Sequence, residues 1–226
     1  MGQLPRLIAF DLDGTLIDSR RDLTDSANAL VVELGGTPLT EEAVSLMVGE
    51  GARLLVQRVT TAAGLGDPPG ALERFLELYA ERLLVHTRLY AGVLGALDAA
   101  ARVATVTLLT NKPLAPTQRI LEGLGIGDRF AHITGGDGRF PRKPDPASLQ
   151  EQMRLVGADP STTLLVGDSA IDRDTAARAG ARCCLVLYGF SRITLPERVD
   201  VPGGWTVTHA SELPAVFTAF SAALTP

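Results

Sequence analysis

Short apolar runs with no polar alternation are the feature that most constrains this fold, because such runs are typical of strands buried on both faces of a sheet. The runs hold four to seven residues each and are rich in aliphatic side chains. They predict a central sheet that is covered on both sides. The strong runs are Leu7–Phe10, Val103–Leu109, Thr163–Gly167 and Cys183–Gly189, and Ala131–Gly135 is a weaker one.

Helical patterns separate these runs. Asp145 is placed to cap a helix that has a proline in its first turn and ends at Gly157. Another helix is expected to end at Gly180, and a final amphipathic helix is predicted over residues 211–224. Alternation of strand and helix favours an α/β fold with a parallel sheet.

Residues 17–88 differ from the rest of the chain because they contain no convincing strand pattern. Apolar residues recur at helical spacing before and after the break at Gly64–Gly70. We therefore expect a helical insertion directly after the first strand. The predicted sheet domain comprises residues 1–16 and 89–226, and the predicted helical domain comprises residues 17–88.

Charge and composition argue against several functions. The 226 residues carry a net charge of -5, which argues against nucleic-acid binding. No apolar run approaches the ~20 residues of a membrane span, and no secretory leader is visible, so a cytoplasmic protein without a membrane partner is expected. Adjacent Cys183 and Cys184 would point to opposite faces of a strand, which predicts core residues and no disulfide scaffold.

Polar residues follow the predicted strands at their carboxyl ends, the edge where open parallel sheets bind ligands. The carboxylates of Asp11 and Asp13, which lie two positions apart, repel each other unless a positive charge lies beside them or one of them is protonated. The set contains hard oxygen ligands and no histidine or cysteine cluster, which favours Mg²⁺ over zinc. The residues are Asp11 and Asp13, Thr110 and Asn111, Asp168 with Asp172 four residues on, and Lys143 in the loop after the weaker run.

A lysine and a threonine at this edge would suit a bound phosphate. One carboxylate could then attack phosphorus while the second carries the proton of the leaving oxygen. Only Lys112 and Lys143 are lysines among 21 basic residues. The bias indicates either codon usage or positions that need a compact charge, which the planar fork of arginine does not supply. For Lys112 we expect a surface role or a supporting one behind the site.

Four motifs in order resemble the signatures of the haloacid dehalogenase superfamily: DLDGT, LLTN, RKPDP and GDSAID. With VGEGA, LLTNKP and GGD, the chain is similar over nearly its whole length to the phosphoglycolate phosphatase branch. The resemblance implies a Rossmann-like core with a small α-helical cap, Mg²⁺ as cofactor and a small phosphorylated metabolite as substrate. It implies hydrolysis of a phosphomonoester, with 2-phosphoglycolate as the expected one, through an aspartyl phosphate.

The same resemblance implies a role for each matching residue. Asp11 resembles the nucleophile and Asp13 the general acid, whereas Thr110 and Lys143 resemble the groups that hold the transferred phosphoryl. Asn111 is expected to orient the phosphate or the nucleophile. The implied Mg²⁺ ligands are the side chain of Asp11, the main-chain carbonyl of Asp13, Asp168 and, directly or through water, Asp172.

The predicted helical domain contributes two further expectations. Glu50 and Arg53 are expected in a loop that faces the site, with Arg53 as a substrate-binding residue. A glutamate there would repel a carboxylate substrate unless a cation lies beside it. Ser19 is expected to cap the first helix of this domain.

Two other functions stay open at this point. A phosphotransferase similar to β-phosphoglucomutase would share the core residues and differ mainly in the cap. A non-enzymatic receiver-like signalling domain would also gather acidic residues, threonine and lysine around Mg²⁺, although it would lack the insertion after the first strand. We expect the protein to be a monomer or a homodimer.

Overall fold

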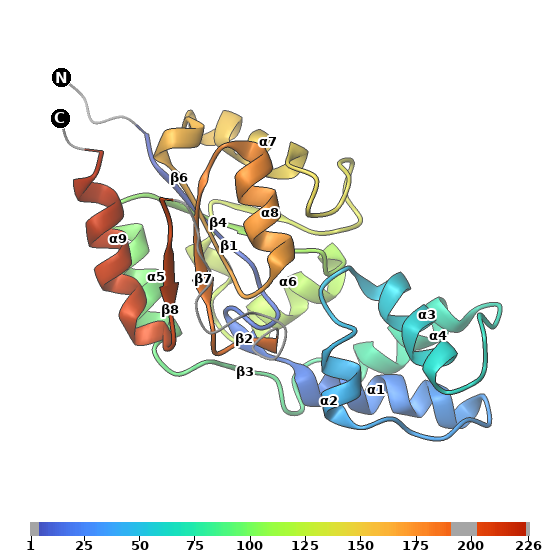
Figure 1. The fold of residues 1–226 in the computed structure, drawn as a ribbon. Coiled ribbons are helices and arrows are strands. Elements are labelled where there is room, and N and C mark those ends of the chain that lie inside the picture. The colour runs from blue at the N-terminus through green and yellow to red at the C-terminus, as the bar shows by residue number, and fades with distance from the viewer. Residues whose placement is uncertain (1–4, 191–202, 225–226) are drawn as a thin grey trace.

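A six-stranded sheet lies at the centre of the computed structural model, which describes residues 5–190 and 203–224 (Figure 1). The strand order is β5-β4-β1-β6-β7-β8, and all neighbouring strands are parallel. The predicted α/β fold with a parallel sheet is confirmed. The strands are β1 (Leu7–Phe10), β4 (Thr105–Leu109), β5 (His132–Thr134), β6 (Thr163–Gly167), β7 (Arg182–Val186) and β8 (Trp205–Val207).

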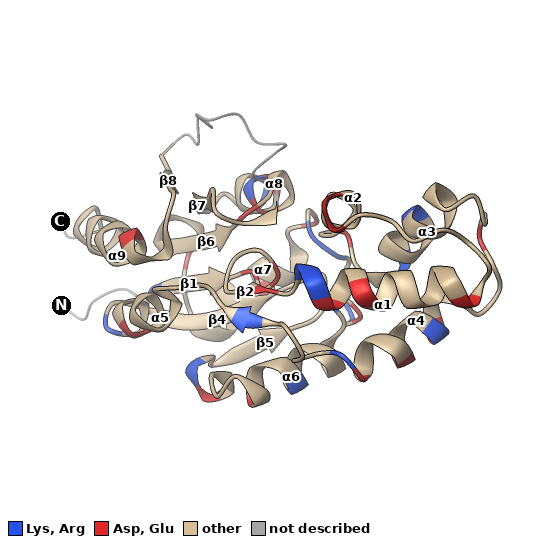
Figure 2. Cartoon of the chain, turned by 90° about the horizontal axis from the view of Figure 1, so that it is seen from below, with Lys and Arg blue, Asp and Glu red and all other residues tan. Residues whose placement is uncertain are grey.

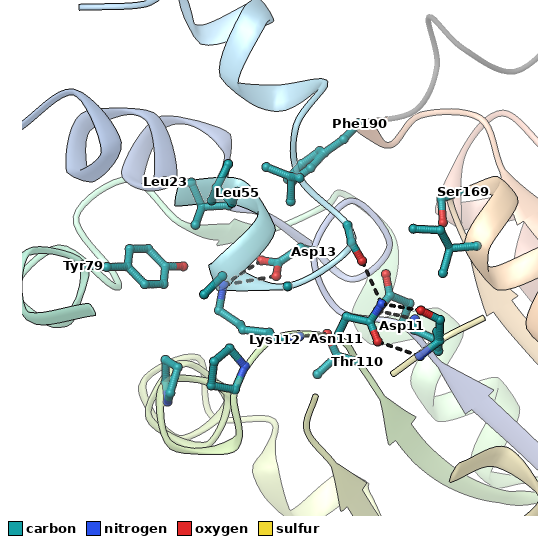
Figure 3. Close-up of a pocket in the computed structure, with 18 of the residues that line it drawn as sticks. Asp11, Asp13, Leu23, Leu55, Tyr79, Thr110, Asn111, Lys112, Ser169 and Phe190 are labelled. Atoms are coloured by element: carbon teal, nitrogen blue, oxygen red, sulfur yellow. Dashed lines mark hydrogen bonds and ion pairs between the residues drawn. The ribbon is translucent and has the colours of Figure 1, made fainter. Parts of the chain in front are cut away.

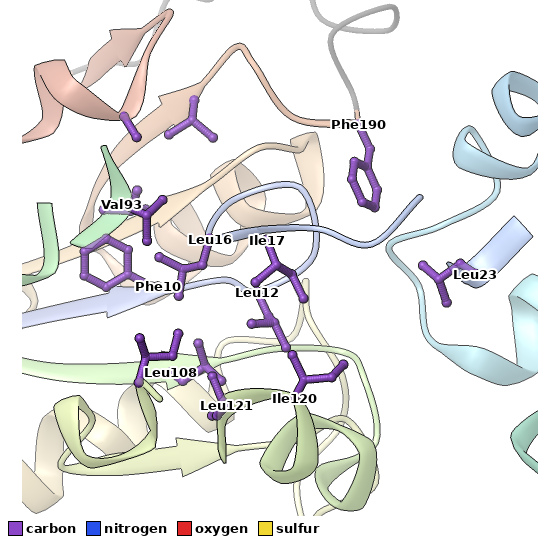
Figure 4. Close-up of a cluster of buried hydrophobic side chains, with 14 of the residues drawn as sticks. Phe10, Leu12, Leu16, Ile17, Leu23, Val93, Leu108, Ile120, Leu121 and Phe190 are labelled. Atoms are coloured by element: carbon purple, nitrogen blue, oxygen red, sulfur yellow. The ribbon is translucent and has the colours of Figure 1, made fainter. Parts of the chain in front are cut away.

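Helices cover both faces of this sheet, which explains the uninterrupted apolar runs. Ile8 and Phe10 belong to one buried cluster with residues of α5, α6 and α9, whose core part is drawn in Figure 4. Leu7 and Ala9, which point to the opposite face, belong to a second cluster with residues of α7 and α8. The helices are α5 (Val93–Ala101), α6 (Leu114–Gly123), α7 (Ala147–Val156), α8 (Ala170–Ala179) and α9 (Leu213–Ala222).

A helical lobe, formed by α1 to α4, lies next to the carboxyl ends of the strands (Figure 2). The chain enters it through β2 (Ile17–Asp18) and leaves it through β3 (Arg88–Leu89), which pair antiparallel. Two chain segments that lie side by side, one entering the lobe and one leaving it, therefore connect the lobe to the sheet. Its helices are α1 (Arg20–Glu33), α2 (Glu41–Ser45), α3 (Ala52–Ala62) and α4 (Ala71–Ala80).

Three strands are absent from the predictions. Two-residue strands such as β2 and β3 are too short to show a period, so the expectation of no strand over residues 17–88 is wrong at both ends of that range. β8 is an edge strand of three residues beside β7.

Among the described residues, no helix has both the length and the apolar character needed to cross a bilayer. Residues 1–4, where a leader would begin, lie outside the described residues.

Asp22 links the two chain segments that connect the lobe to the sheet. Its buried carboxylate accepts hydrogen bonds from the backbone N–H groups of His86 and Thr87, at 2.7 to 3.0 Å, and from the Thr87 hydroxyl at 2.7 Å. The first turn of α1 is thereby tied to the segment that leads out of the lobe. Since buried backbone N–H groups need acceptors, this carboxylate stabilises the base of the lobe.

We predict that Asp22→Asn lowers the free energy of unfolding by about 2–3 kcal/mol, because an amide offers N–H groups where donors already converge. Urea denaturation measures this effect. Asp25→Asn is the matched control on the same helix, since Asp25 forms an exposed ion pair with Arg21, and its expected cost is under about 0.5 kcal/mol. Equal costs for the two variants would contradict the role assigned to Asp22.

Candidate active site

The carboxyl ends of β1, β4 and β6 bring the predicted residues together. Phe10 pairs in register with Leu108 and Val166, so Asp11, Thr110 and Asp168 follow neighbouring strands at nearly the same level. All three are buried. They face a pocket between the sheet and the helical lobe (Figure 3). Its polar lining includes Asp11, Asp13, Thr110, Asn111, Lys112, Lys143, Asp168 and Ser169.

Lys143 lies between two buried carboxylates. Its Nζ is 2.8 Å from Asp11 Oδ1 and 2.6 Å from Asp172 Oδ1. Burial raises the pKa of Asp11 to about 6, with Asp172 adding to the increase and Lys143 opposing it. Burial by itself would lower the pKa of Lys143, but the two carboxylates raise it overall. The site therefore keeps a compact positive charge beside Asp11.

Lys112 forms a second ion pair of the same kind. Its Nζ lies 3.1 Å from both carboxylate oxygens of Asp13, and it is only 7% exposed. Of the two alternatives expected for Lys112, the surface position is therefore wrong, whereas a supporting contact with a site residue is what the structure shows. The contact joins residues 99 positions apart, which no local pattern indicates. The two aspartates of the DLDGT motif are thus each paired with one of the chain's two lysines.

Ser19 also contacts Asp13. Its hydroxyl donates to Asp13 Oδ1 at 2.5 Å, and it makes no side-chain capping bond to α1. The predicted capping role for Ser19 is therefore wrong, although the residue does occupy the N-cap position. Asp13 is held from two sides, by Ser19 at the entry to the lobe and by Lys112 from the loop after β4.

Three carboxylates form a candidate metal centre. Ligand oxygens of Asp11, Asp168 and Asp172 lie within 4.8 Å of one another, and an all-oxygen donor set suits Mg²⁺. The backbone amide of Phe190 donates to Asp168 Oδ2 at 2.7 Å. A Cβ on Gly14, which has φ +84°, would lie 2.3 Å from the same oxygen. The donor set and its tight packing fit a small divalent cation.

Asp172 is fixed by the start of α8. It accepts hydrogen bonds at Oδ2 from the Ser169 hydroxyl at 2.6 Å and the Ser169 backbone amide at 3.2 Å. Ser169 in turn accepts from the Asp172 amide, which completes a capping box. A capping motif thereby holds the carboxylate in place next to Lys143.

Asn111 uses its amide to connect the loops around the pocket. Its Oδ1 accepts from the Lys143 amide at 2.8 Å, and its Nδ2 donates at 2.9 Å to the carbonyls of Lys143 and Gly49. Both donors are occupied. Asn111 is therefore placed to position Lys143 and to anchor the Gly49 loop of the lobe.

The structure does not bring Glu50 or Arg53 to the pocket lining. Arg53 is exposed on the first turn of α3. Glu50 forms an ion pair with Arg58, so a cation does lie beside it. The lobe instead lines the pocket with apolar and aromatic groups, which sequence reasoning missed because pocket and core residues share one helical pattern. They include Leu23, Leu55, Phe75, Leu76 and Tyr79.

Comparison with known proteins agrees with this geometry. The model of a family described as haloacid dehalogenase-like hydrolase matches residues 8–186. A solved structure described as a predicted phosphoglycolate phosphatase from Haemophilus somnus has a TM-score of 0.83 with 28% identity, and the match covers 96% of this chain and 99% of that one.

Curated relatives are similar over most of their length. The phosphoglycolate phosphatase of Rhodospirillum rubrum is 43% identical over 198 residues, which cover 84% of this chain and 82% of that protein. Phosphoglycolate phosphatase 1 of Pseudomonas aeruginosa is 38% identical over 196 residues, with 84% and 72% covered. On the family match, these identities and the site described above, this chain belongs to the haloacid dehalogenase-like hydrolase family.

Proposed function

We propose that this chain is a Mg²⁺-dependent phosphatase that hydrolyses 2-phosphoglycolate to glycolate and inorganic phosphate. The observation that carries the proposal is the pairing of Asp11 with Lys143 and of Asp13 with Lys112 in one pocket. Such a site offers a nucleophile, a proton carrier and two cations to an anionic ester. The names of the curated relatives support 2-phosphoglycolate as the substrate.

In the first step, a carboxylate oxygen of Asp11 attacks phosphorus, and the bond between phosphorus and the ester oxygen breaks. Protonated Asp13 gives its proton to the leaving oxygen, so glycolate departs as an alcohol. In the second step, ionised Asp13 takes a proton from water while the water oxygen attacks the aspartyl phosphate. Phosphate leaves and Asp11 is restored. Thr110 and Lys143 hold the phosphoryl oxygens throughout.

The residues that would hold Mg²⁺ are Asp11, Asp168 and Asp172, together with the main-chain carbonyl of Asp13. A bound Mg²⁺ supplies positive charge that offsets the carboxylates and the phosphoryl oxygens. Asp172 is also bonded to Lys143 and Ser169, and it would serve the metal directly or through water.

Residues 17–88 act in this proposal as a cap on a core of residues 1–16 and 89–226. Leu23, Leu55 and Tyr79 of the lobe line the pocket and would exclude water from the reacting phosphoryl group. The predictions of a cytoplasmic location and of a monomer or homodimer remain part of the proposal.

Phosphate release from a panel of small phosphomonoesters, with Mg²⁺ and with a chelator, tests the proposal. We expect steady turnover that is fastest with 2-phosphoglycolate and that the chelator abolishes. Fast release from another ester would keep the reaction and change the substrate. Transfer of the phosphoryl group to a sugar phosphate without steady release would favour a mutase. A folded protein that releases and transfers nothing would favour a binding role.

A further inference from the structure

Lys112 is a buried cation that lines the pocket. Among the described residues that line the pocket, the cations are Lys112 and Lys143. Lys143 is held at the reacting end, between Asp11 and Asp172. Asp13 accepts two hydrogen bonds from Lys112, whereas an ammonium group has three N–H donors. The third N–H faces the hydroxyl oxygen of Tyr79, so Lys112 offers a ligand its charge next to a tyrosine hydroxyl.

Tyr79 of α4 supplies a second, independent indication of a ligand. Tyr79 is 3% exposed, and its hydroxyl interacts with Lys112 but finds no acceptor for its own proton among the described residues. The ring centroid lies 4.6 Å from Lys112 Nζ, and the hydroxyl points from the lobe toward Asp13 and the pocket (Figure 3). Since an unsatisfied buried hydroxyl is costly, a bound acceptor is expected here.

We propose that Lys112 and Tyr79 together bind the carboxylate of the substrate and set its specificity. The inference rests on the proposed function and deepens it. Asp13, which carries the proton of the leaving oxygen in the proposed function, lies 3.1 Å from Lys112 Nζ, so Lys112 stands beside the leaving-group end of the substrate. A phosphoryl group at Thr110 and a carboxylate at Lys112 would therefore be separated by only a few bonds, as they are in 2-phosphoglycolate.

The remaining surroundings strengthen this assignment. The pocket surface of the lobe near Tyr79 is apolar, with Leu23, Phe75 and Leu76, so a carboxylate finds no competing cation there. Arg53, the cation that the sequence predicts for substrate binding, is exposed outside the lining. The subsite takes one group from the core and one from the lobe, so it is complete only when the lobe is closed over the sheet.

The test compares 2-phosphoglycolate with ethyl phosphate, in which a methyl group replaces the carboxylate. The measured quantity is the ratio of kcat/KM for the two substrates. We expect the ratio to fall about 100-fold in Lys112→Met and about 10-fold in Tyr79→Phe, because a hydrogen bond to a charged group is lost in each. Arg154→Met, which removes an exposed cation on α7, is the control and should leave the ratio unchanged.

The ratio of the two kcat/KM values shows whether Lys112 recognises the carboxylate of the substrate or only positions Asp13. If Lys112 only positions Asp13, both substrates lose the same factor and the ratio stays constant in both variants, which would overturn the proposal. Should Lys112→Met fail to fold, Tyr79→Phe decides alone. The wild-type rates are measured first, so absent phosphatase activity would overturn the proposed function, whereas good turnover with constant ratios would overturn only the subsite.

Discussion

Asp11→Asn is expected to reduce phosphate release from 2-phosphoglycolate by about four orders of magnitude or more, the scale seen when a nucleophile is removed. The amide cannot attack phosphorus, and no aspartyl phosphate forms. The initial rate at saturating substrate and Mg²⁺ measures the effect. Asp174→Asn is the matched control, since Asp174 forms an ion pair with Arg173 and does not line the pocket; its rate should stay within about twofold of wild type. Full activity in Asp11→Asn would refute the assignment of the nucleophile.

The same variant should fold at least as well as the wild-type protein in metal-free buffer. Burial raises the pKa of Asp11 from 3.8 to about 6. A carboxyl whose pKa is higher in the folded state contributes stability at pH below 3.8 and loses it as the pH rises through 6. The unfolding free energy of the wild type should therefore fall relative to Asp11→Asn across this range. Urea titrations at several pH values would reveal it, and parallel curves would contradict it.

Lys143→Met is expected to have the second largest effect, and it should impair both activity and stability. Without the ammonium group, the buried carboxylates of Asp11 and Asp172 face each other uncompensated, at a cost of about 3–5 kcal/mol. Phosphate release should fall by about a thousandfold, because the phosphoryl oxygens lose a charged donor. Urea denaturation and the initial rate measure the two effects, with Arg178→Met as an exposed control on α8.

Lys143→Arg separates charge from shape. A planar guanidinium keeps the charge but does not match a site in which one nitrogen contacts carboxylates at 2.6 and 2.8 Å. We expect stability between those of wild type and Lys143→Met, with activity close to that of Lys143→Met. Full activity in Lys143→Arg would show that a compact charge is not required and that the rarity of lysine in this chain reflects codon usage.

The reacting end of the site could be predicted from the sequence because parallel topology fixes where strand ends lie. Once Leu7–Phe10, the run that ends at Leu109 and Thr163–Gly167 are recognised as neighbouring strands, Asp11, Thr110 and Asp168 must meet at one edge. A local pattern of about five residues determines each strand, and each polar residue follows its strand directly. The inference needs no long-range information beyond strand adjacency.

The roles of Lys112, Ser19 and Arg53 could not be predicted in this way. Lys112 reaches Asp13 across 99 positions, and Ser19 occupies an N-cap position but donates its hydrogen bond elsewhere. Arg53 belongs to a helix whose exposed side faces away from the pocket lining. For Lys112 and Ser19 the residue type and local spacing fit several partners, and packing between distant segments selects one.

The sequence by itself therefore determined the parallel sheet, the helical insertion and the positions of Asp11, Thr110 and Asp168 at the strand ends, because short-range hydrophobic patterns and strand direction encode them. Only the tertiary structure decided how the lobe meets that edge. It placed the Tyr79 ring beside Lys112 and left the hydroxyl proton of Tyr79 without an acceptor among the described residues, and it enclosed the pocket with apolar helix faces. Contacts of this kind depend on side-chain packing between distant segments, which leaves no periodic signal in the chain.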